Sequence, residues 1–354
     1  MKKSYTVNEK ELLDFCHLCL VKYGMEKDNA LIMAQHLIET DKWGIFTHGT
    51  KNLLGYIKKN LAGGVSFKSK PSFIKEFLSL ALLDSNNMTG FISGTIAMEK
   101  ACDMAEKTGV GMVVVVNSCH YGAGACYANI AAKRGFIGFC ASNVDKKMTI
   151  PGSKGTVIGH NPFTIAAPAT IIPSVFLDSS SSNTSALKVL RAKQDKESIP
   201  YGWICDKDGN PTNDPSKFPE EGGLIPMGNH KGYGIAFFID VLTGLLGSSL
   251  NSISDNIPSW CFDLDKPNKV SHTFIAINSK MLNVYFENDI DKLINDVHEL
   301  PKSNKDQQIY VPGEIEWNNY YKNNNGTIFL PEDVVCELIK LSDFSGISLK
   351  VEEQ

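Results

Sequence analysis

One histidine of this chain, His120, lies between an apolar stretch and a glycine turn. It follows the run VGMVVVVNSC, which is typical of a buried strand, and precedes Gly122-Ala-Gly124. A histidine titrates near neutral pH, so it can give a proton to a reacting oxygen or take one from it. Ligands also collect at strand ends in α/β sheets. His120 is therefore our first candidate for proton transfer, with a purely structural hydrogen-bonding role as the alternative.

A second histidine, His48, is followed by Lys51 and Asn52 in the segment THGTKN. If a helix begins here, the spacings i+3 and i+4 place these three side chains on one face. A proton donor and a cation could then converge on an acidic substrate. The alternative is a surface helix start in which the histidine and the lysine have no role.

The common phosphate-binding motifs are not matched. The dinucleotide fingerprint G-x-G-x-x-G needs a third glycine, but Tyr127 stands at that position in GAGACY. Lys231, in GNHKGYG, lacks both the spacing and the following Ser or Thr of a nucleotide-binding P-loop. Cys119 does not form a nucleophile–base pair with His120, because consecutive strand residues point to opposite faces. An ordinary Rossmann domain is therefore not supported.

The elements that position these residues follow from hydrophobic patterning. Asn8 and Glu11 fit a capping box before a first amphipathic helix, and Asp28 fits the cap of a second. A third helix is expected within 47–64, and a long one from Thr89 to Lys107.

Short apolar runs between glycines follow from residue 109 to residue 178. They predict strands at 110–116, 135–141, 156–160, 163–169 and 174–178, with an earlier strand at 79–85. Runs that are apolar throughout are typical of strands buried on both faces, so we expect helices on both sides of this sheet. The predicted fold class is α/β.

The remainder of the chain continues this mixed pattern. We expect a hairpin at 204–212, an apolar and central helix after PMGNHKGYG, a strand at 272–278, a helix at 288–300, an exposed loop at 318–326 and a last helix starting at Pro331.

Composition restricts the classes of partner. The chain has 354 residues, 43% of them hydrophobic, and a formal net charge of −4, with no basic cluster typical of a nucleic-acid binder. No apolar stretch approaches the roughly 20 residues that span a bilayer, so we expect a cytoplasmic protein that acts on a small molecule. Cys16 and Cys19 lie on the apolar stripe of a helix, which favours core packing over a metal site.

Taken together, the motifs resemble one family, the type 2 malate/L-lactate dehydrogenases. That family also includes ureidoglycolate dehydrogenases, diketogulonate reductases and cyclic-imine reductases. The resemblance covers nearly the whole chain and rests on THG at 47–49 with Tyr56, NSCHYGAG at 117–124, GHNPFTIAAP at 159–168, IPYGWICDKDGNPTNDP at 199–215, PMGNHKGYG at 226–234 and VPGE at 311–314.

The resemblance implies a fold and an activity. The fold is a non-Rossmann α/β fold with a mixed central sheet flanked by helices and a helical N-terminal portion. We divide it into a helical substrate-side segment (1–75), a cofactor-binding and catalytic core (76–315) and a C-terminal helical segment that packs back on the N-terminal part (316–354). The activity is NAD- or NADP-dependent oxidoreduction by a homodimer whose active site lies near the subunit contact.

Site residues are carried over position by position. His120 matches the family's catalytic histidine, with Cys119 in place of the usual asparagine, and His48 matches a histidine to which some members assign proton transfer. The positions that match cofactor contacts are Asp178, Ser179, Ser180, Lys231, Ser142 and Asn143, with a weaker match near Asn268.

The chain departs from the family at one substrate-binding position. Asn52 replaces the usual arginine, and an asparagine cannot neutralise a substrate carboxylate. We expect Lys51 to substitute as a point charge. The predicted reaction interconverts a 2-hydroxy acid and a 2-oxo acid, first of all malate and oxaloacetate. An imine or diketo sugar-acid reductase, or an inactive cofactor-binding relative, are the alternatives.

Overall fold

A seven-stranded mixed sheet forms the centre of the molecule. The computed structural model describes residues 4–247, 253–323 and 325–353. The sheet order is β2-β3-β4-β11-β5-β6-β7, with β3 and β4 parallel and the other neighbours antiparallel. The strands are β2 (Ser72–Glu76), β3 (Leu80–Asp84), β4 (Val110–Ser118), β5 (Ile137–Ser142), β6 (Phe163–Pro168), β7 (Ser174–Ser179) and β11 (Val270–Ile277). The predicted α/β fold with a mixed sheet is confirmed.

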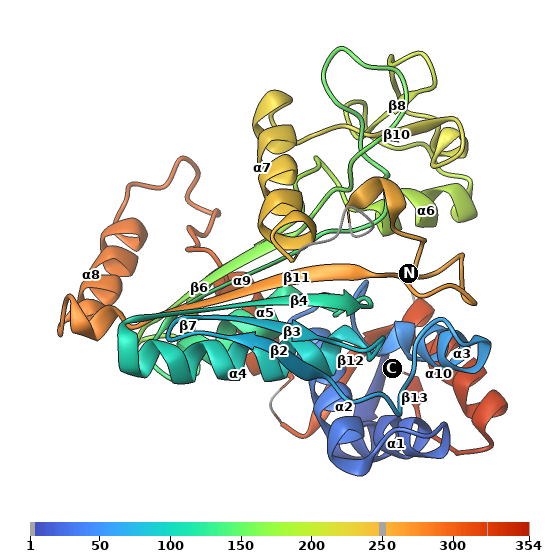
Figure 1. Cartoon of the computed structure of the whole chain (residues 1–354). Coiled ribbons are helices and arrows are strands. Elements are labelled where there is room, and N and C mark those ends of the chain that lie inside the picture. Colours follow the sequence, from blue (N-terminus) through green and yellow to red (C-terminus); the bar gives the residue numbers. More distant parts are fainter. Residues whose placement is uncertain (1–3, 248–252, 324, 354) are drawn as a thin grey trace.

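Two long helices cover one face of this sheet. Both α4 (Gly90–Thr108) and α5 (Gly124–Lys133) pack below it in Figure 1, whereas α7 (His230–Asp240) crosses the opposite face. Phe274 of β11 and Tyr127 of α5 are fully buried between sheet and helices, with ring centroids 5.4 Å apart. Tyr127, which occupies the position of the missing third glycine, is thus a core residue.

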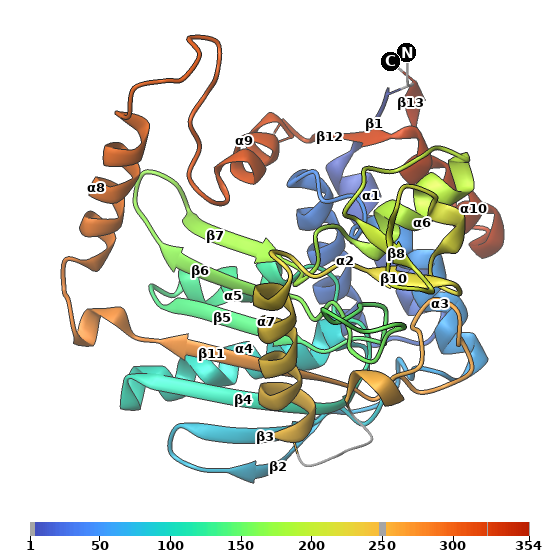
Figure 2. The ribbon, with the colours of Figure 1, turned by 90° about the horizontal axis from the view of Figure 1, so that it is seen from above.

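The two ends of the chain build a second part together. Strand β1 (Ser4–Asn8) pairs with β12 (Thr327–Pro331) on one side and β13 (Glu352–Glu353) on the other, so both termini lie side by side (Figure 2). The helices around this small sheet are α1 (Glu9–Lys22), α2 (Lys27–Lys42), α3 (Leu53–Ala62) and α10 (Glu332–Ser345). Cys16 and Cys19 are fully buried in their shared core, as expected from the apolar stripe.

A smaller unit with its own apolar cluster lies above the sheet. It contains α6 (Ala186–Asp195) and the strands β8 (Ile204–Asp206), β9 (Pro211–Thr212) and β10 (Gly222–Leu224). Val189, Ile204, Phe218 and Leu224 are fully buried in its core. The remaining helices are α8 (Phe286–His298) and α9 (Glu314–Lys322). The division of the chain at residues 75 and 315 stays a prediction.

Several local predictions are confirmed by the backbone. The Asn8 side chain accepts a hydrogen bond from the Glu11 amide at 3.1 Å, which caps α1. Thr89 caps α4, and α10 starts directly after Pro331. The hairpin β8–β9 turns at Gly209, whose φ of 86° is in the left-handed region that glycine adopts without strain.

Four predicted features are wrong, although the second and third helices themselves are present. Helix α2 begins before Asp28, with Glu26 at the cap position. Helix α3 begins only at Leu53, so His48 precedes it in a turn and shares no helical face with Lys51. Ile158 makes isolated bridge contacts instead of a strand at 156–160. Most of 318–326 belongs to α9, because Trp317 buries its indole against the sheet and holds this polar segment in place.

The sheet is also less covered than its apolar strands suggest. On β6 and β7, Ala166 and Phe176 face α5, whereas Ile165 and Leu177 alternate to the other side and stay 43% and 45% exposed. Helix α7 is not central, since Phe238 on its outer side is 64% exposed. No helix of the described residues is long and apolar enough to cross a bilayer.

Candidate active site

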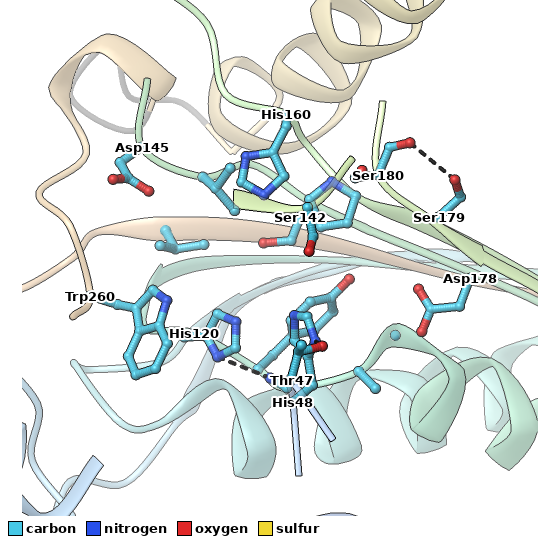
Figure 3. A pocket seen from close by; sticks show the side chains of 18 of the residues that line it. Thr47, His48, His120, Ser142, Asp145, His160, Asp178, Ser179, Ser180 and Trp260 are labelled. Carbon is cyan, nitrogen blue, oxygen red and sulfur yellow. Dashed lines mark hydrogen bonds between the residues drawn. The ribbon is translucent and has the colours of Figure 1, made fainter. Parts of the chain in front are cut away.

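A cavity of about 310 Å³ opens where three strands of the sheet end. Strands β4, β5 and β7 run in the same direction, so their C-terminal ends meet at one edge. His120 follows β4, Ser142 ends β5, and Asp178 lies near the end of β7. All three line the cavity, together with His48, His160, Ser179, Ser180 and Trp260 (Figure 3). The fold therefore brings together residues that are up to 212 positions apart (48 to 260).

The two predicted histidines are adjacent in a stack of rings. The His120 ring lies between Trp260, at a centroid distance of 4.7 Å, and His48, at 5.7 Å. The interplanar angles are 18° and 22°, so the three rings are nearly parallel. Tyr56 from α3 stacks on Trp260 at 5.2 Å. This packing leaves the imidazole of His120 little freedom to rotate.

The hydrogen bonds of His120 determine its neutral tautomer. The amide of Gly122 donates to Nδ1 at 3.3 Å, and the Tyr56 hydroxyl lies 2.8 Å from the same atom. An amide N–H can only donate, so Nδ1 accepts and Nε2 carries the proton of the neutral ring. Protonation of Nδ1 would place two donors against each other. Burial, followed by the nearby His48, His272, His160 and Lys147, also holds the pKa of His120 well below its ordinary value.

The environment of His48 is more tolerant of positive charge. Its Nδ1 lies 2.9 Å from the Thr47 hydroxyl, which can accept a proton from it as well as donate one. Burial lowers the pKa of His48, and the Asp178 carboxylate acts in the opposite direction. Asp178 itself accepts hydrogen bonds from the Ala125 amide and the Thr164 hydroxyl, both at 2.9 Å, while burial raises its pKa.

A buried carboxylate at the end of α2 holds the turn that carries His48. Asp41 is fully buried, and its Oδ2 accepts hydrogen bonds from the Thr50 amide at 3.1 Å and from the Thr50 hydroxyl. A Cβ at Gly49 would lie 1.8 Å from Asp41 Oδ1, so only glycine fits between them. Burial raises the pKa of Asp41 to about 7, which the bonds from Thr50 partly oppose.

Groups suited to a nicotinamide cofactor line the other side of the cavity. The Asp178 carboxylate and the hydroxyl groups of Ser179 and Ser180 can bind ribose hydroxyls, and Ser142 lies opposite them. The Nδ1 of His160 is buried without a partner among the described residues, and burial lowers the pKa of this histidine to about 4. His160 therefore lines the cavity as a neutral imidazole, which can form a hydrogen bond to a polar group of a ligand.

Of the other residues predicted to contact the cofactor, Asn143 and Lys231 lie outside the cavity lining and Asn268 belongs to it. Asn143 is fully buried and accepts from the Ser271 amide at 2.8 Å, so it joins β11 to the end of β5 and is not among the cavity-lining residues. Lys231 is exposed at the start of α7, also outside the cavity lining. Asn268 does line the cavity and accepts from the Cys119 thiol at 2.9 Å.

The predicted substrate-binding residues line an adjoining cavity of about 660 Å³. Lys51 forms an ion pair with Asp333 at 2.7 Å, and the Asn52 side chain donates to the Thr47 carbonyl at 2.7 Å. Neither lines the cavity that holds the histidines. Thr47 and Lys188 line both cavities.

Several cavity residues were not assigned from the sequence. His160 lies in the motif GHNPFTIAAP, which offered a signal, since a histidine directly before a strand is a candidate on the same grounds as His120. Trp260, Asp145 and Lys188 lie in no motif that indicates chemistry. Only the folded chain brings them to the histidines.

Comparisons with known proteins show the family of this chain. The profile of the family described as malate/L-lactate dehydrogenase matches residues 7–339. A malate dehydrogenase of Pyrococcus abyssi is 32% identical over 317 residues, which are 87% of this chain and 86% of the relative. An L-sulfolactate dehydrogenase of Methanocaldococcus jannaschii is 31% identical and covers 90% of each chain.

A solved structure shows the same fold. The crystal structure of a malate dehydrogenase from Entamoeba histolytica superposes with a TM-score of 0.91 at 27% identity, over 98% of this chain and 99% of the other. Profile, sequence relatives and structure therefore agree over nearly the whole chain. The chain belongs to the malate/L-lactate dehydrogenase family and is an oxidoreductase of the 2-hydroxy acid dehydrogenase type, which uses a nicotinamide cofactor.

Proposed function

We propose that this enzyme interconverts a 2-hydroxy acid and a 2-oxo acid, and that malate and oxaloacetate are its substrates. The observation that carries the proposal is the stacked pair of His48 and His120 at the strand ends, with Asp178 and two serines across the same cavity. The malate and sulfolactate dehydrogenases among the relatives support a 2-hydroxy acid as the substrate class. The cofactor is NAD or NADP.

The two histidines divide the chemistry between them. When bound, the cofactor supplies a hydride to the carbonyl carbon of the 2-oxo acid, and negative charge develops on the oxygen. His120 stays neutral and donates a hydrogen bond from Nε2 to that oxygen. His48, with Thr47 and Asp178 beside it, gives its proton to the same oxygen and takes it back in the oxidation. This assignment reverses our expectation from the sequence, which put His120 first for proton transfer.

An absorbance assay tests the function. NADH and NADPH oxidation is followed with oxaloacetate, pyruvate, a diketo sugar acid and a cyclic imino acid. We expect the highest kcat/KM for oxaloacetate. Highest turnover of the sugar acid or of the imino acid would favour a reductase of that class instead, and cofactor binding without turnover would indicate an inactive relative.

Variants of the two histidines separate their roles. His48→Asn removes the proton donor, so we expect kcat to fall by about 10²- to 10⁴-fold. His120→Asn keeps a hydrogen-bond donor near the carbonyl oxygen and should retain more activity. The opposite order of the two variants would restore His120 as the proton-transfer residue.

We also propose that the enzyme is a homodimer. Large apolar side chains are exposed on the face of the sheet opposite α5 and on the helix that lies there: Ile165, Leu177, Phe237, Phe238, Leu245 and Leu246. Exposed large apolar side chains on one side of a sheet are typical of a subunit contact. A second copy of this chain is the occupant that the family resemblance favours.

A further inference from the structure

The cavity with the histidines contains a single residue suited to hold the substrate carboxylate. A 2-oxo acid is an anion, and an anion in a partly buried cavity needs a cation or several N–H donors. Among the described residues that line this cavity, Lys188 is the sole Lys or Arg. We propose that Lys188 binds the carboxylate of the 2-oxo acid and takes the place of the arginine missing at Asn52; this inference rests on the proposed function.

The other cations near the site are neutralised. Lys51 pairs with Asp333 at 2.7 Å, and Arg191 pairs with the same carboxylate at 2.7 Å and with Asp195 at 2.5 Å. In contrast, no described residue forms an ion pair or side-chain hydrogen bond with the Lys188 ammonium group. A substrate that bound Lys51 or Arg191 would compete with Asp333, whereas Lys188 has a free charge.

The acidic residues of the cavity favour a role for this ammonium group. The acidic residues of the lining are Asp145, Asp178 and Glu316. Asp145 pairs with Lys147 at 2.6 Å, but Asp178 has hydrogen-bond donors and no ion pair among the described residues. The Lys188 ammonium group would offset the repulsion between the Asp178 carboxylate and a bound substrate carboxylate.

The position of Lys188 suits the role. It lies in the first turn of α6, and its helix cap Ser185 also lines the cavity. Lys188 and Thr47 line both the histidine cavity and the adjoining one, so Lys188 borders on the turn that carries His48. A substrate carboxylate bound there leaves the neighbouring carbonyl group for His48 and His120. The adjoining cavity can receive the rest of a longer acid.

The test compares four lysine variants of the full-length enzyme, one of which is Lys51→Met. Lys188→Met keeps the aliphatic stem and removes the charge, Lys188→Arg keeps the charge, and Lys193→Met alters the same helix outside both cavity linings. We measure KM for oxaloacetate and, by fluorescence, the dissociation constant for NADH. Thermal unfolding checks that each variant is folded.

We expect Lys188→Met to raise KM for oxaloacetate by about 10- to 100-fold, as for the loss of a hydrogen bond between charged groups. Because the Lys188 side chain is exposed, the NADH dissociation constant should change by less than about threefold in this variant. Lys188→Arg should recover most of the loss, and Lys193→Met should resemble the wild type. If Lys188→Met changes the affinity for NADH and leaves KM for oxaloacetate unaltered, the proposal is overturned and Lys188 is assigned to the cofactor. If KM rises in Lys51→Met alone, Lys51 binds the substrate carboxylate instead.

Binding of oxalate tests the role of Lys188 without any turnover of substrate. This unreactive dianion resembles a 2-oxo acid, and its binding to the NADH complex can be followed by the fluorescence of NADH. If the wild-type enzyme reduces no 2-oxo acid, the proposed function fails by itself. The proposed role of Lys188 in carboxylate binding is then still supported if oxalate binds the wild type and not Lys188→Met. The role is contradicted if both proteins bind oxalate equally or if neither binds it.

Discussion

His48 and His120 differ in what their neighbours permit, although both are imidazoles in one cavity. His120 receives an amide N–H at Nδ1 and is kept neutral, which suits a hydrogen-bond donor to a carbonyl oxygen. His48 is placed beside a hydroxyl and under the influence of the Asp178 carboxylate, which stabilises its protonated form. The pH dependence of the reaction should therefore report His48.

Reduction needs protonated His48, and oxidation needs the neutral form. Because burial lowers the pKa of His48 below its ordinary value, kcat/KM for reduction should fall as the pH rises through that lowered pKa, and kcat/KM for oxidation should rise over the same range. Asp178→Asn removes the carboxylate that opposes this shift. We expect the pH at which kcat/KM changes to move toward lower pH in Asp178→Asn, when kcat/KM is measured at saturating cofactor.

Asp145→Asn is the matched control for that variant. Asp145 lines the same cavity, but it pairs with Lys147 and is not among the groups that shift the pKa of His48. The pH dependence of kcat/KM in Asp145→Asn should coincide with that of the wild type. An equal shift of this pH dependence in both variants would mean that overall cavity charge, and not Asp178, sets the pKa of His48.

The ring stack gives a further prediction at this scale. Trp260 packs on His120 at 4.7 Å and fixes the plane of its imidazole. Trp260→Phe keeps an aromatic face there, whereas Trp260→Ala leaves the ring free to turn away from the substrate. We expect kcat to fall by roughly tenfold or more in Trp260→Ala and much less in Trp260→Phe. Equal kcat values in both variants would show that the stack has no positioning role.

Among the elements, the turn between α2 and α3 is the one that the site depends on. It is too short and irregular to hold His48 by itself, and its position comes from the bonds between Thr50 and Asp41 at the end of α2. Oδ1 of Asp41 is buried beside Gly49 without a partner in the described chain, which suits a protonated carboxyl group. Burial raises the pKa of this group to about 7.

This raised pKa makes a prediction about stability. The folded state binds the proton more tightly than the unfolded chain does, so the contribution of Asp41 to stability is greatest below the ordinary aspartate pKa of 3.8 and is lost as the pH rises through about 7. Asp41→Asn is neutral at every pH. Between about pH 4 and pH 8, the stability of Asp41→Asn relative to the wild type should increase by several kcal/mol, at most about 4.

Urea unfolding at several pH values measures this difference. A constant difference between Asp41→Asn and the wild type would contradict a raised pKa at Asp41. Asp41→Ala, by contrast, leaves the Thr50 amide without a partner and should be about 1–3 kcal/mol less stable than Asp41→Asn at each pH. Its kcat should fall as well, because the His48 turn is released, while Asp41→Asn should keep kcat near that of the wild type.

At the scale of the whole molecule, the exposed apolar face determines assembly. Phe238 is 64% exposed on α7, a helix on the same side of the sheet as the open face of β6 and β7. Stable dimers bury roughly 1,200 to 2,000 Å² or more, much of it apolar in the centre. We expect the wild type to be a dimer by light scattering and Phe238→Asp to dissociate at micromolar concentration. Leu61→Asp, at a 57% exposed position on α3, should leave the dimer intact. A monomeric wild type would contradict the proposed homodimer.

The sequence alone predicted most of the elements. Strands β4 and β5, the span of α4 and the start of α10 follow from short-range patterns, namely apolar runs, a helical periodicity and a proline. Such patterns act over a few residues, so a single chain displays them. The motifs also identified His48, His120 and Asp178, which line one cavity as expected from their common family.

The tertiary structure decided what the residues of the site can do. Spacing suggested Lys51 as the cation, but an ion pair with Asp333, 282 positions away, occupies its charge, and Lys188 from a different helix lines the cavity instead. The bond from Gly122 and the ring of Trp260 likewise determine the tautomer and orientation of His120. Charge, tautomer and exposure depend on neighbours that are distant in the chain, and local patterns carry no information about them. The sequence thus determined the family, the fold and the two histidines, and only the packing of the folded chain decided their roles.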